Sequence, residues 1–357
     1  MKTKMSIPQR IWAYVKGNPI VVMMALVSLI VGCTIKNFFS LNNFNVLMGN
    51  TTIRFLIALG VSGCLITKGT DLSAGRQAAL AATLTGVMVQ RADYASRMFS
   101  WMPEMNMWVV LLIVLAIGAV IGTITGMIIA YLKVPPFIAT LGTMLVSRGL
   151  TAVIAEASRG MSSAVKYPAT GWFQKVFTNL GGFPIGLVWV LVLTILCMVV
   201  MYKTKIGRYI LAIGSNEEAA RLSGIDTDKY KILAYIIGGF FASLAALFYV
   251  AANPSLNIAS GNGMELDAIA GVYIGGTSTT GGSASIIGTI LGSLILVIIR
   301  QGLNLAMSGG SAVSATNITY AVTGVIVVGA VLLDVLKKKN AAKVKIDTID
   351  KAKAEKK

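Results

Sequence analysis

The segment Gly214-Ser-Asn-Glu-Glu-Ala-Ala-Arg-Leu-Ser-Gly-Ile225 is a short charged run between two long apolar stretches. Asn216 is a residue type that caps helix N-termini, and two glutamates follow it where the helix dipole favours negative charge. Glu217 can pair with Arg221 four residues later, and Gly224 can end the helix in a left-handed conformation. The run predicts a helix of about two turns, too short to be stable alone in water, so we expect it to dock on another surface.

The composition around this segment is that of a membrane protein. Apolar residues make up 55% of the 357 residues, charged residues only 13%, and the mean hydropathy is +0.76. An ordinary soluble domain has about 25% charged residues. Segments 73–90 and 262–277 are short for a span, which needs about 20 residues, and such segments are candidates for broken helices around a substrate path. We expect ten spans, at 18–36, 44–66, 73–90, 107–131, 136–156, 185–202, 230–251, 262–277, 285–306 and 317–336.

The charge distribution sets the expected orientation. The net charge of +17 is concentrated in the two terminal segments and around the 214–225 run, not in a pattern typical of nucleic-acid binding. Positive residues favour the cytoplasmic side, so an even number of spans places both termini there and turns loops 157–184, 252–261 and 307–316 outward. We expect the basic tail to be disordered or to lie along anionic lipid. The predicted organisation is a cytoplasmic segment at 1–17, a transmembrane domain at 18–336 with a cytoplasmic loop at 204–229, and a cytoplasmic tail at 337–357.

Histidine and the ATP-binding P-loop motif are both missing from the chain. The chain has no histidine, which removes imidazole acid–base catalysis and imidazole metal ligands. It has no Gly-x4-Gly-Lys-Ser/Thr motif, so ATP would have to bind to another polypeptide. Its three cysteines, Cys33, Cys64 and Cys197, all fall inside apolar segments and are expected to be packing residues. We see no cleavable signal peptide.

A second informative stretch runs from Ile57 to Gln77. An apolar helix reaches Lys68-Gly69, breaks, and is expected to restart with Thr70 or Asp71 as its N-cap. A charge at the centre of a membrane helix costs about 2.5–3.5 kcal/mol. The charges of this stretch must therefore reach the interface, line a polar cavity or neutralise one another. Two interpretations stay open: a helix break beside the translocation path, or an interfacial loop whose charges are hydrated.

The second half of the chain contains a similar pattern in the range 267–282. An apolar run is again followed by Gly-Thr and a small polar break, so Gly69-Thr70 aligns with Gly276-Thr277, and Gly75 aligns with Gly282. This similarity predicts two related halves, as is frequent in transporters. Glu265 and Asp267 open the second element, where they can interact with the helix dipole. Our candidate path residues, which include two on the 136–156 helix, are Thr70, Asp71, Ser73, Gly75, Arg76, Gln77, Thr140, Thr143, Gly276, Thr277 and Gly282.

Small residues recur at helix-packing spacing in two further segments. Gly118, Gly122 and Gly126 are four residues apart, as are Gly288 and Gly292. Such ridges let membrane helices approach closely, so we expect a packing role for them.

Taken together, four segments make the chain resemble the ribose/galactose-type permeases of sugar ABC importers over nearly its whole length. They are 57–77, 133–143, 207–225 and 265–282, and Thr70–Gln77 is more similar to the galactose type than to the ribose type. The resemblance implies a homodimer in the bacterial inner membrane, a cytoplasmic ATPase with tandem nucleotide-binding domains, and an extracytoplasmic sugar-binding protein. It also implies that ATP and Mg²⁺ bind only to the partner. The implied coupling helix consists of Asn216, Glu217, Glu218, Ala219, Ala220, Arg221, Leu222, Ser223 and Gly224.

Other functions were weighed against this one. A stand-alone secondary transporter would need intramembrane carboxylates for ion coupling, and Asp71, Glu156, Glu265 and Asp267 all lie at segment ends. An ABC permease for a nucleoside or another small solute stays open, because the loop 157–184 and the long basic tail differ from what the family leads us to expect. A membrane enzyme is disfavoured by the missing histidine.

Overall fold

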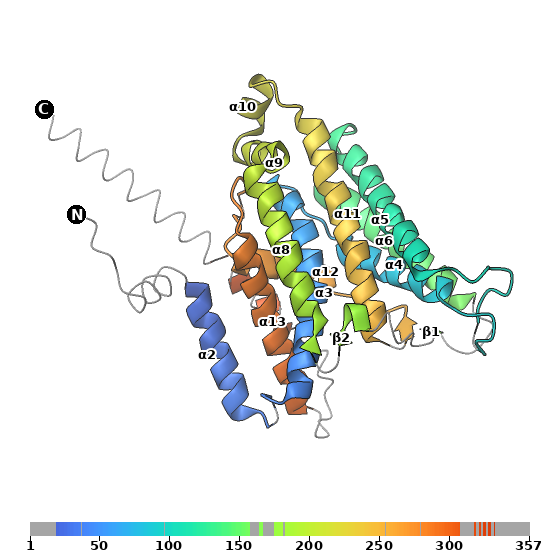
Figure 1. Ribbon diagram of the computed structural model, residues 1–357. Coiled ribbons are helices and arrows are strands. Elements are labelled where there is room, and N and C mark those ends of the chain that lie inside the picture. The colour runs from blue at the N-terminus through green and yellow to red at the C-terminus, as the bar shows by residue number, and fades with distance from the viewer. Residues whose placement is uncertain are drawn as a thin grey trace, which may run out of the picture.

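The computed structural model describes residues 19–307 apart from 37, 96, 158–163, 167–174, 181–182, 254 and 279, and separate residues between 318 and 332. These residues form a bundle of long helices with two short helices at one end (Figure 1). The helices are α2 (Pro19–Thr34), α3 (Leu41–Ile66), α4 (Ala74–Met88), α5 (Met107–Ala130), α6 (Pro136–Glu156), α8 (Ile185–Lys203), α9 (Lys205–Ser215), α10 (Glu217–Leu222), α11 (Thr227–Ala252), α12 (Met264–Ile274) and α13 (Ile286–Met307).

The predicted spans match these helices closely wherever the structure describes them. Among the described residues, six helices are long and apolar enough to cross a membrane, namely α3, α5, α6, α8, α11 and α13. The other expected spans correspond to α2, α4 and α12, which have 16, 15 and 11 residues. Of the expected span 317–336, the structure describes only separate residues between 318 and 332, and the two terminal segments lie outside the described residues. The structure therefore supports a helical multi-pass protein, and the count of ten spans stays a prediction.

Helices α3 and α11 form the centre of the bundle. In the apolar window of α3, 89% of the residues are buried, whereas in α6 only 22% are. The exposed side chains of α6 include Leu145 and Val153, which suit contact with lipid. The backbone polar groups of a membrane helix are satisfied within the helix itself, so side-chain packing decides which helices lie inside.

Glycine ridges bring pairs of helices together, as expected. A Cβ atom added at Gly118, Gly122 or Gly126 of α5 would come closer than 3.0 Å to atoms of α11. The same holds for Gly292 of α13 against Gly271 of α12, and for Gly288 against Gly275, the C-cap of α12. These glycines are packing residues whose missing side chains let the helix backbones approach.

The two ends of the bundle are built differently. At one end, β1 (Ala164–Lys166) pairs antiparallel with β4 (Ser255–Asn257), and β2 (Asn179–Leu180) pairs with β3 (Phe183–Pro184). At the other end lie α9, α10 and an ion pair between Lys133 and Asp228, whose Nζ and Oδ1 atoms are 2.7 Å apart (Figure 1). Loops expected on opposite sides of the membrane are thus found at opposite ends.

Candidate coupling helix and helix breaks

Helix α10 occupies the run that opened the sequence analysis. The side-chain oxygen of Asn216 accepts a hydrogen bond from the Ala219 amide at 3.0 Å, which confirms the predicted N-cap. Gly224 has φ +82°, and its amide donates to the Arg221 carbonyl, while the Ile225 amide donates to that of Ala220. This is the left-handed C-terminal motif that glycine favours.

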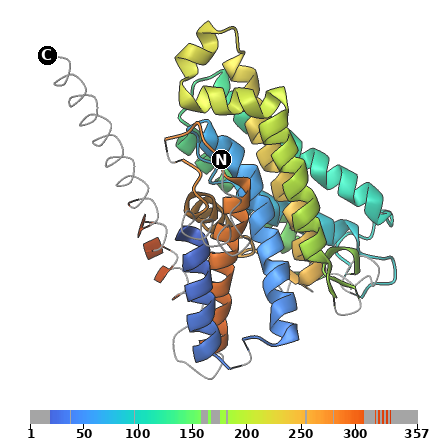
Figure 2. The ribbon, with the colours of Figure 1, turned by 60° about the vertical axis from the view of Figure 1, so that its left-hand side comes forward.

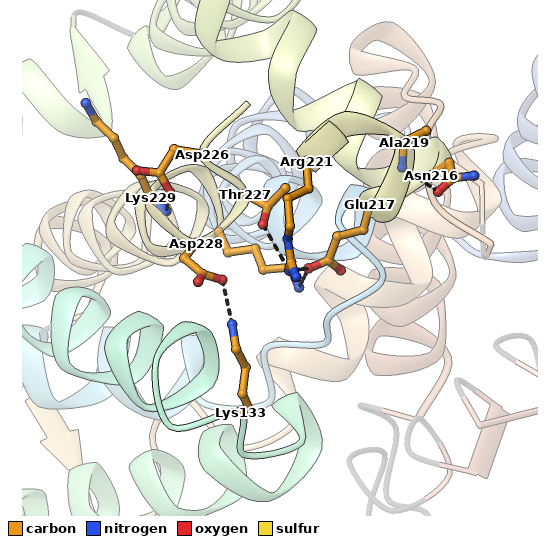
Figure 3. A network of polar contacts seen from close by, with 10 residues as sticks. Lys133, Asn216, Glu217, Ala219, Arg221, Asp226, Thr227, Asp228 and Lys229 are labelled. Atoms are coloured by element: carbon orange, nitrogen blue, oxygen red, sulfur yellow. Dashed lines mark hydrogen bonds and ion pairs between the residues drawn. The ribbon is translucent and has the colours of Figure 1, made fainter. Parts of the chain in front are cut away.

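Ion pairs fix α10 to the start of α11 (Figure 3). The predicted pair between Arg221 and Glu217 is present at 3.5 Å, but a shorter one joins Lys231 Nζ to the same Glu217 carboxylate at 2.6 Å. Arg221 also lies 3.5 Å from the Thr227 hydroxyl. Asp226 caps α11 by accepting from the Lys229 amide at 3.0 Å. Spacing along one helix cannot reveal the contact with Lys231, because it crosses between two helices.

The outer surface of α10 is open. Ala220 is buried beneath the helix, whereas Leu222 is 82% exposed. Glu218, Ala219 and Ser223 are exposed as well. The outer face of α10 is therefore accessible to another protein.

Helix α9 was not predicted. It runs from Lys205 to Ser215 directly before α10 and buries Ile210 and Ile213. Ile206, Ile210 and Ile213 follow the four- and three-residue spacing of an amphipathic helix, which is the signal that could have identified it. The sequence-based prediction for this segment is only a cytoplasmic loop at 204–229.

The first break differs in detail from the prediction. Helix α4 begins at Ala74 with Ser73 as its N-cap, so neither Thr70 nor Asp71 occupies that position. Asp71 is buried and accepts hydrogen bonds at Oδ1 from the Ser73 amide at 2.9 Å and the Ser73 hydroxyl at 2.5 Å. Gln77 donates to that same hydroxyl at 2.6 Å. The carboxylate thus orders the turn before the helix, because it can bind both donors of Ser73 from two residues away.

The two basic side chains of the first break lie in different environments. Lys68 is exposed and reaches the surface, whereas Arg76 is buried. The guanidinium of Arg76 donates to the Ile258 and Ser260 carbonyl oxygens at 2.9 and 3.2 Å and to the Asn262 side chain at 3.0 Å. Arg76 therefore anchors the loop before α12 to the start of α4.

Gly75 lies at the same contact. A Cβ atom there would come closer than 3.0 Å to the Gly261 carbonyl oxygen and the Glu265 amide. The start of α4 and the loop before α12 thus touch backbone to backbone. A side chain at this position would have to displace one of them.

The second break lies between α12 and α13. Gly276, Gly281 and Gly282 have φ of +87°, +79° and +76°, and the Thr277 hydroxyl accepts from the Ser285 amide at 3.3 Å. The two breaks begin with the same turn: the Lys68 and Gly276 amides each donate to the carbonyl three residues before them.

This shared turn corrects the alignment of the two patterns by one residue. Lys68, which has φ +63°, corresponds to Gly276, and Gly69 corresponds to Thr277. The sequence alignment had matched the glycines with each other. The left-handed position is occupied by glycine in only one of the two turns.

The two candidate residues on α6 lie at another interface. Thr140 is buried and donates to the Pro136 carbonyl at 2.8 Å. The Thr143 hydroxyl is 2.9 Å from that of Thr125 on α5. These hydroxyls make their contacts within α6 and with α5, rather than with the two breaks.

A buried ionic cluster joins α3, α12 and α13. Asp267 lies 3.0 Å from Nε of Arg54 and 2.8 Å from Nη2 of Arg300, and the Asp267 side chain is 2% exposed. The sequence predicts only an interaction of Asp267 with the helix dipole, whereas the structure places it in an ion-pair cluster. The signal we missed is that two arginines interrupt otherwise apolar helices, since such residues need a buried partner.

Comparison with known proteins places the chain among transport permeases. Residues 43–331 match the family described as branched-chain amino acid transport system / permease component. The chain is 36% identical to the galactose/methyl galactoside import permease protein of Escherichia coli K12, over 91% of this chain and 95% of that protein. It is 37% identical to the ribose import permease protein of the same strain, over 80% and 85% of the two chains. A fructose import permease protein of Bifidobacterium longum is 34% identical over 78% of each chain. No solved structure matches the chain.

Proposed function

The chain belongs to the family of permease components of the branched-chain amino acid transport system type, and we propose that it forms the membrane path for a small sugar in an ATP-driven importer. It is a multi-pass transport subunit and not an enzyme. The printed functions of its relatives, which are import of galactose, ribose and fructose, support a monosaccharide as the solute. The comparisons gave no support to a stand-alone secondary transporter.

The observation that carries the coupling role is the geometry of α10. The helix is only six residues long, yet its N-cap, its left-handed end and the 2.6 Å pair with Lys231 fix its position on the bundle. Its apolar Leu222 points away from the chain with 82% of its surface exposed. We propose that a separate cytoplasmic ATPase covers this surface. ATP and Mg²⁺ then bind to that ATPase and not to this chain.

The mechanism is alternating access between two arrangements of the helices. An extracytoplasmic sugar-binding protein delivers the solute to the outward end, and closure of the ATPase on ATP moves α10. Two copies of the chain enclose the path, as the resemblance to homodimeric permeases implies. The breaks at 67–73 and 275–285 are the proposed path-lining segments, because irregular backbone inside a membrane bundle is tolerated where it is buried in protein or lines a cavity.

We also propose ten spans in two related halves, with both termini in the cytoplasm. The pairing of β1 with β4 supports this topology, because it joins two loops that ten alternating spans both place outside. The ion pair from Lys133 to Asp228 supports it too, since it joins two loops that the same count places inside. The similar sequence patterns around the two breaks support the relation between the halves.

A co-purification experiment tests the proposed function. The tagged chain is expressed with the ATPase encoded beside it, and the purified complex is placed in liposomes with the neighbouring binding protein and radiolabelled galactose or ribose. We expect the ATPase to co-purify and uptake to require ATP. Leu222→Asp should abolish co-purification, whereas Trp101→Asp, a matched change of an exposed apolar residue at the other end, should not. ATP-independent uptake, or no association with the unmodified chain, would overturn the proposal.

A further inference from the structure

The end of α9 touches both helix breaks at once. The Gly282 amide donates a hydrogen bond to the Ile66 carbonyl oxygen at 3.1 Å, which joins the second break to the end of α3. Gly214, in the last turn of α9, is buried against both partners. A Cβ atom on Gly214 would come closer than 3.0 Å to the Ile66 carbonyl oxygen and to the Gly282 nitrogen.

The contact is equally close when it is approached from the second break. A Cβ atom on Gly282 would lie 2.8 Å from the Ser215 backbone nitrogen, and one on Gly281 would lie 2.7 Å from the Ile66 carbonyl oxygen. Three segments far apart in sequence therefore meet through their backbones, and the side chains of Ser215 and Lys68 also lie at this contact. We call this contact the backbone junction, formed by Ile66, Gly214, Ser215, Gly281 and Gly282.

The junction is adjacent to the coupling helix. Asn216, the N-cap of α10, is the only residue between α9 and α10, and its amide donates to the Ala212 carbonyl at 3.0 Å. The turned view shows α9 crossing the end of the bundle beside α10 (Figure 2). The Tyr202 hydroxyl adds a link from α8 to the same break by donating to the Ala284 carbonyl at 2.9 Å. A displacement of α10 must therefore move a segment that rests directly on both breaks.

We infer that the backbone junction transmits movement of α10 to the two helix breaks, and that Gly214 is a positioning residue for coupling ATP hydrolysis to transport. This inference rests on the proposed function. Side chains can absorb a small displacement by changing rotamer, whereas closely packed backbones pass it on as a rigid contact. Glycine at position 214 permits that contact, because any larger residue separates α9 from Ile66 and Gly282.

The ratio of ATP hydrolysed to sugar imported distinguishes transmission from simple packing. In the reconstituted importer, with galactose and ribose as probes, Gly214→Ala should leave co-purification with the ATPase intact. It should raise the ratio by about ten-fold or more, because energetic coupling between sites is commonly of that size. Gly142→Ala is the matched control, since a Cβ atom at Gly142 meets nothing within 4 Å.

Each outcome bears on one proposal or the other. A normal ratio in Gly214→Ala would overturn the role of the junction while leaving the proposed function intact. Failure of the unmodified chain to bind the ATPase would overturn the proposed function instead. If Gly214→Ala does not accumulate in membranes, Ser215→Ala decides the question, because it removes the Ser215 Oγ that lies against Gly282 without adding an atom to the junction. An unchanged ratio in that well-expressed variant would refute transmission, and a raised one would support it.

Discussion

The Asp267 carboxylate lies 3.0 Å from Nε of Arg54, which places an ion pair halfway along α3. Arg300 contacts the same carboxylate at 2.8 Å, so one carboxylate forms ion pairs with two guanidinium groups. A charge buried in the membrane is costly unless it is paired. This cluster pins the first turn of the short helix α12, where Asp267 lies, to α3 and α13.

Removing the acid of this cluster should destabilise the protein. Asp267→Asn leaves the buried Arg54 and the partly buried Arg300 facing a neutral group, and breaking a buried pair by removing one partner costs about 3–5 kcal/mol. We expect a clearly lower thermal unfolding midpoint for the variant purified in detergent.

A matched change two residues earlier serves as the control for Asp267→Asn. Glu265→Gln removes the same charge but keeps an acceptor for the Gly263 amide, which Glu265 binds at 3.2 Å. We expect the thermal unfolding midpoint of this variant to be close to that of the unmodified protein. Equal losses in the two variants would show that the cluster has no special role.

The pair between Glu217 and Lys231 should position α10. At present the Glu217 carboxylate lies 2.6 Å from the Lys231 ammonium group. Glu217→Lys replaces this attraction with repulsion between two ammonium groups, and it also removes the partner of Arg221. We expect weaker stimulation of the partner ATPase and slower sugar uptake, with membrane insertion unchanged.

The exchanged double variant tests whether this effect comes from the pair. Combining Glu217→Lys with Lys231→Glu restores opposite charges across the contact, so it should recover part of the lost stimulation. Glu217→Lys alone with normal stimulation would contradict the coupling assignment. A double variant no better than the single one would assign the effect to the surface of α10 instead.

Cysteine labelling in intact cells can determine the orientation. On a background lacking Cys33, Cys64 and Cys197, a cysteine at position 101 should react with an impermeant reagent, and one at position 222 should react only after lysis. Both positions are strongly exposed, at 76% and 82%, so in cells that lack the partner ATPase their access is governed by the side of the membrane. Labelling of position 222 from outside would invert the topology.

Helix positions could be predicted from the sequence, because apolar length and capping residues are local signals. The predicted segment 136–156 coincides with α6, and Asn216 and Gly224 bound α10 as expected. Helix α9 was missed because its basic residues were interpreted as a loop, although its isoleucines have helical spacing. The start of α4 was misplaced because Asp71 binds Ser73 instead of capping the helix itself.

Contacts between distant segments could not be predicted in this way. The Arg54–Asp267 pair joins residues 213 positions apart, and the Lys231–Glu217 pair crosses between two helices. No local pattern encodes them, since they depend on how the helices pack. The meeting of the two breaks at Gly282 and Ile66 is of the same kind.

The last prediction concerns Gly75, in the first turn of α4 directly after the first break, and Gly282, in the second break. A side chain at Gly75 would displace the loop before α12, and Gly282 has φ +76°, a conformation that residues other than glycine rarely adopt. Gly75→Val and Gly282→Val should therefore reduce sugar uptake strongly. Gly118→Ala would be a poor comparison, because a Cβ atom at Gly118 would contact Ser243 and Gly239 closer than 3.0 Å.

Gly142→Val is the suitable control for both valine variants, because position 142 is open space on the surface of α6. Membrane amounts must be measured for all three proteins, since misfolding alone would also abolish uptake. We expect the two break variants to bind the ATPase yet import little galactose or ribose, while Gly142→Val imports normally. Normal uptake by both well-expressed break variants would make the breaks ordinary loops, and the path would then have to be sought along α6, where Thr140 and Thr143 lie.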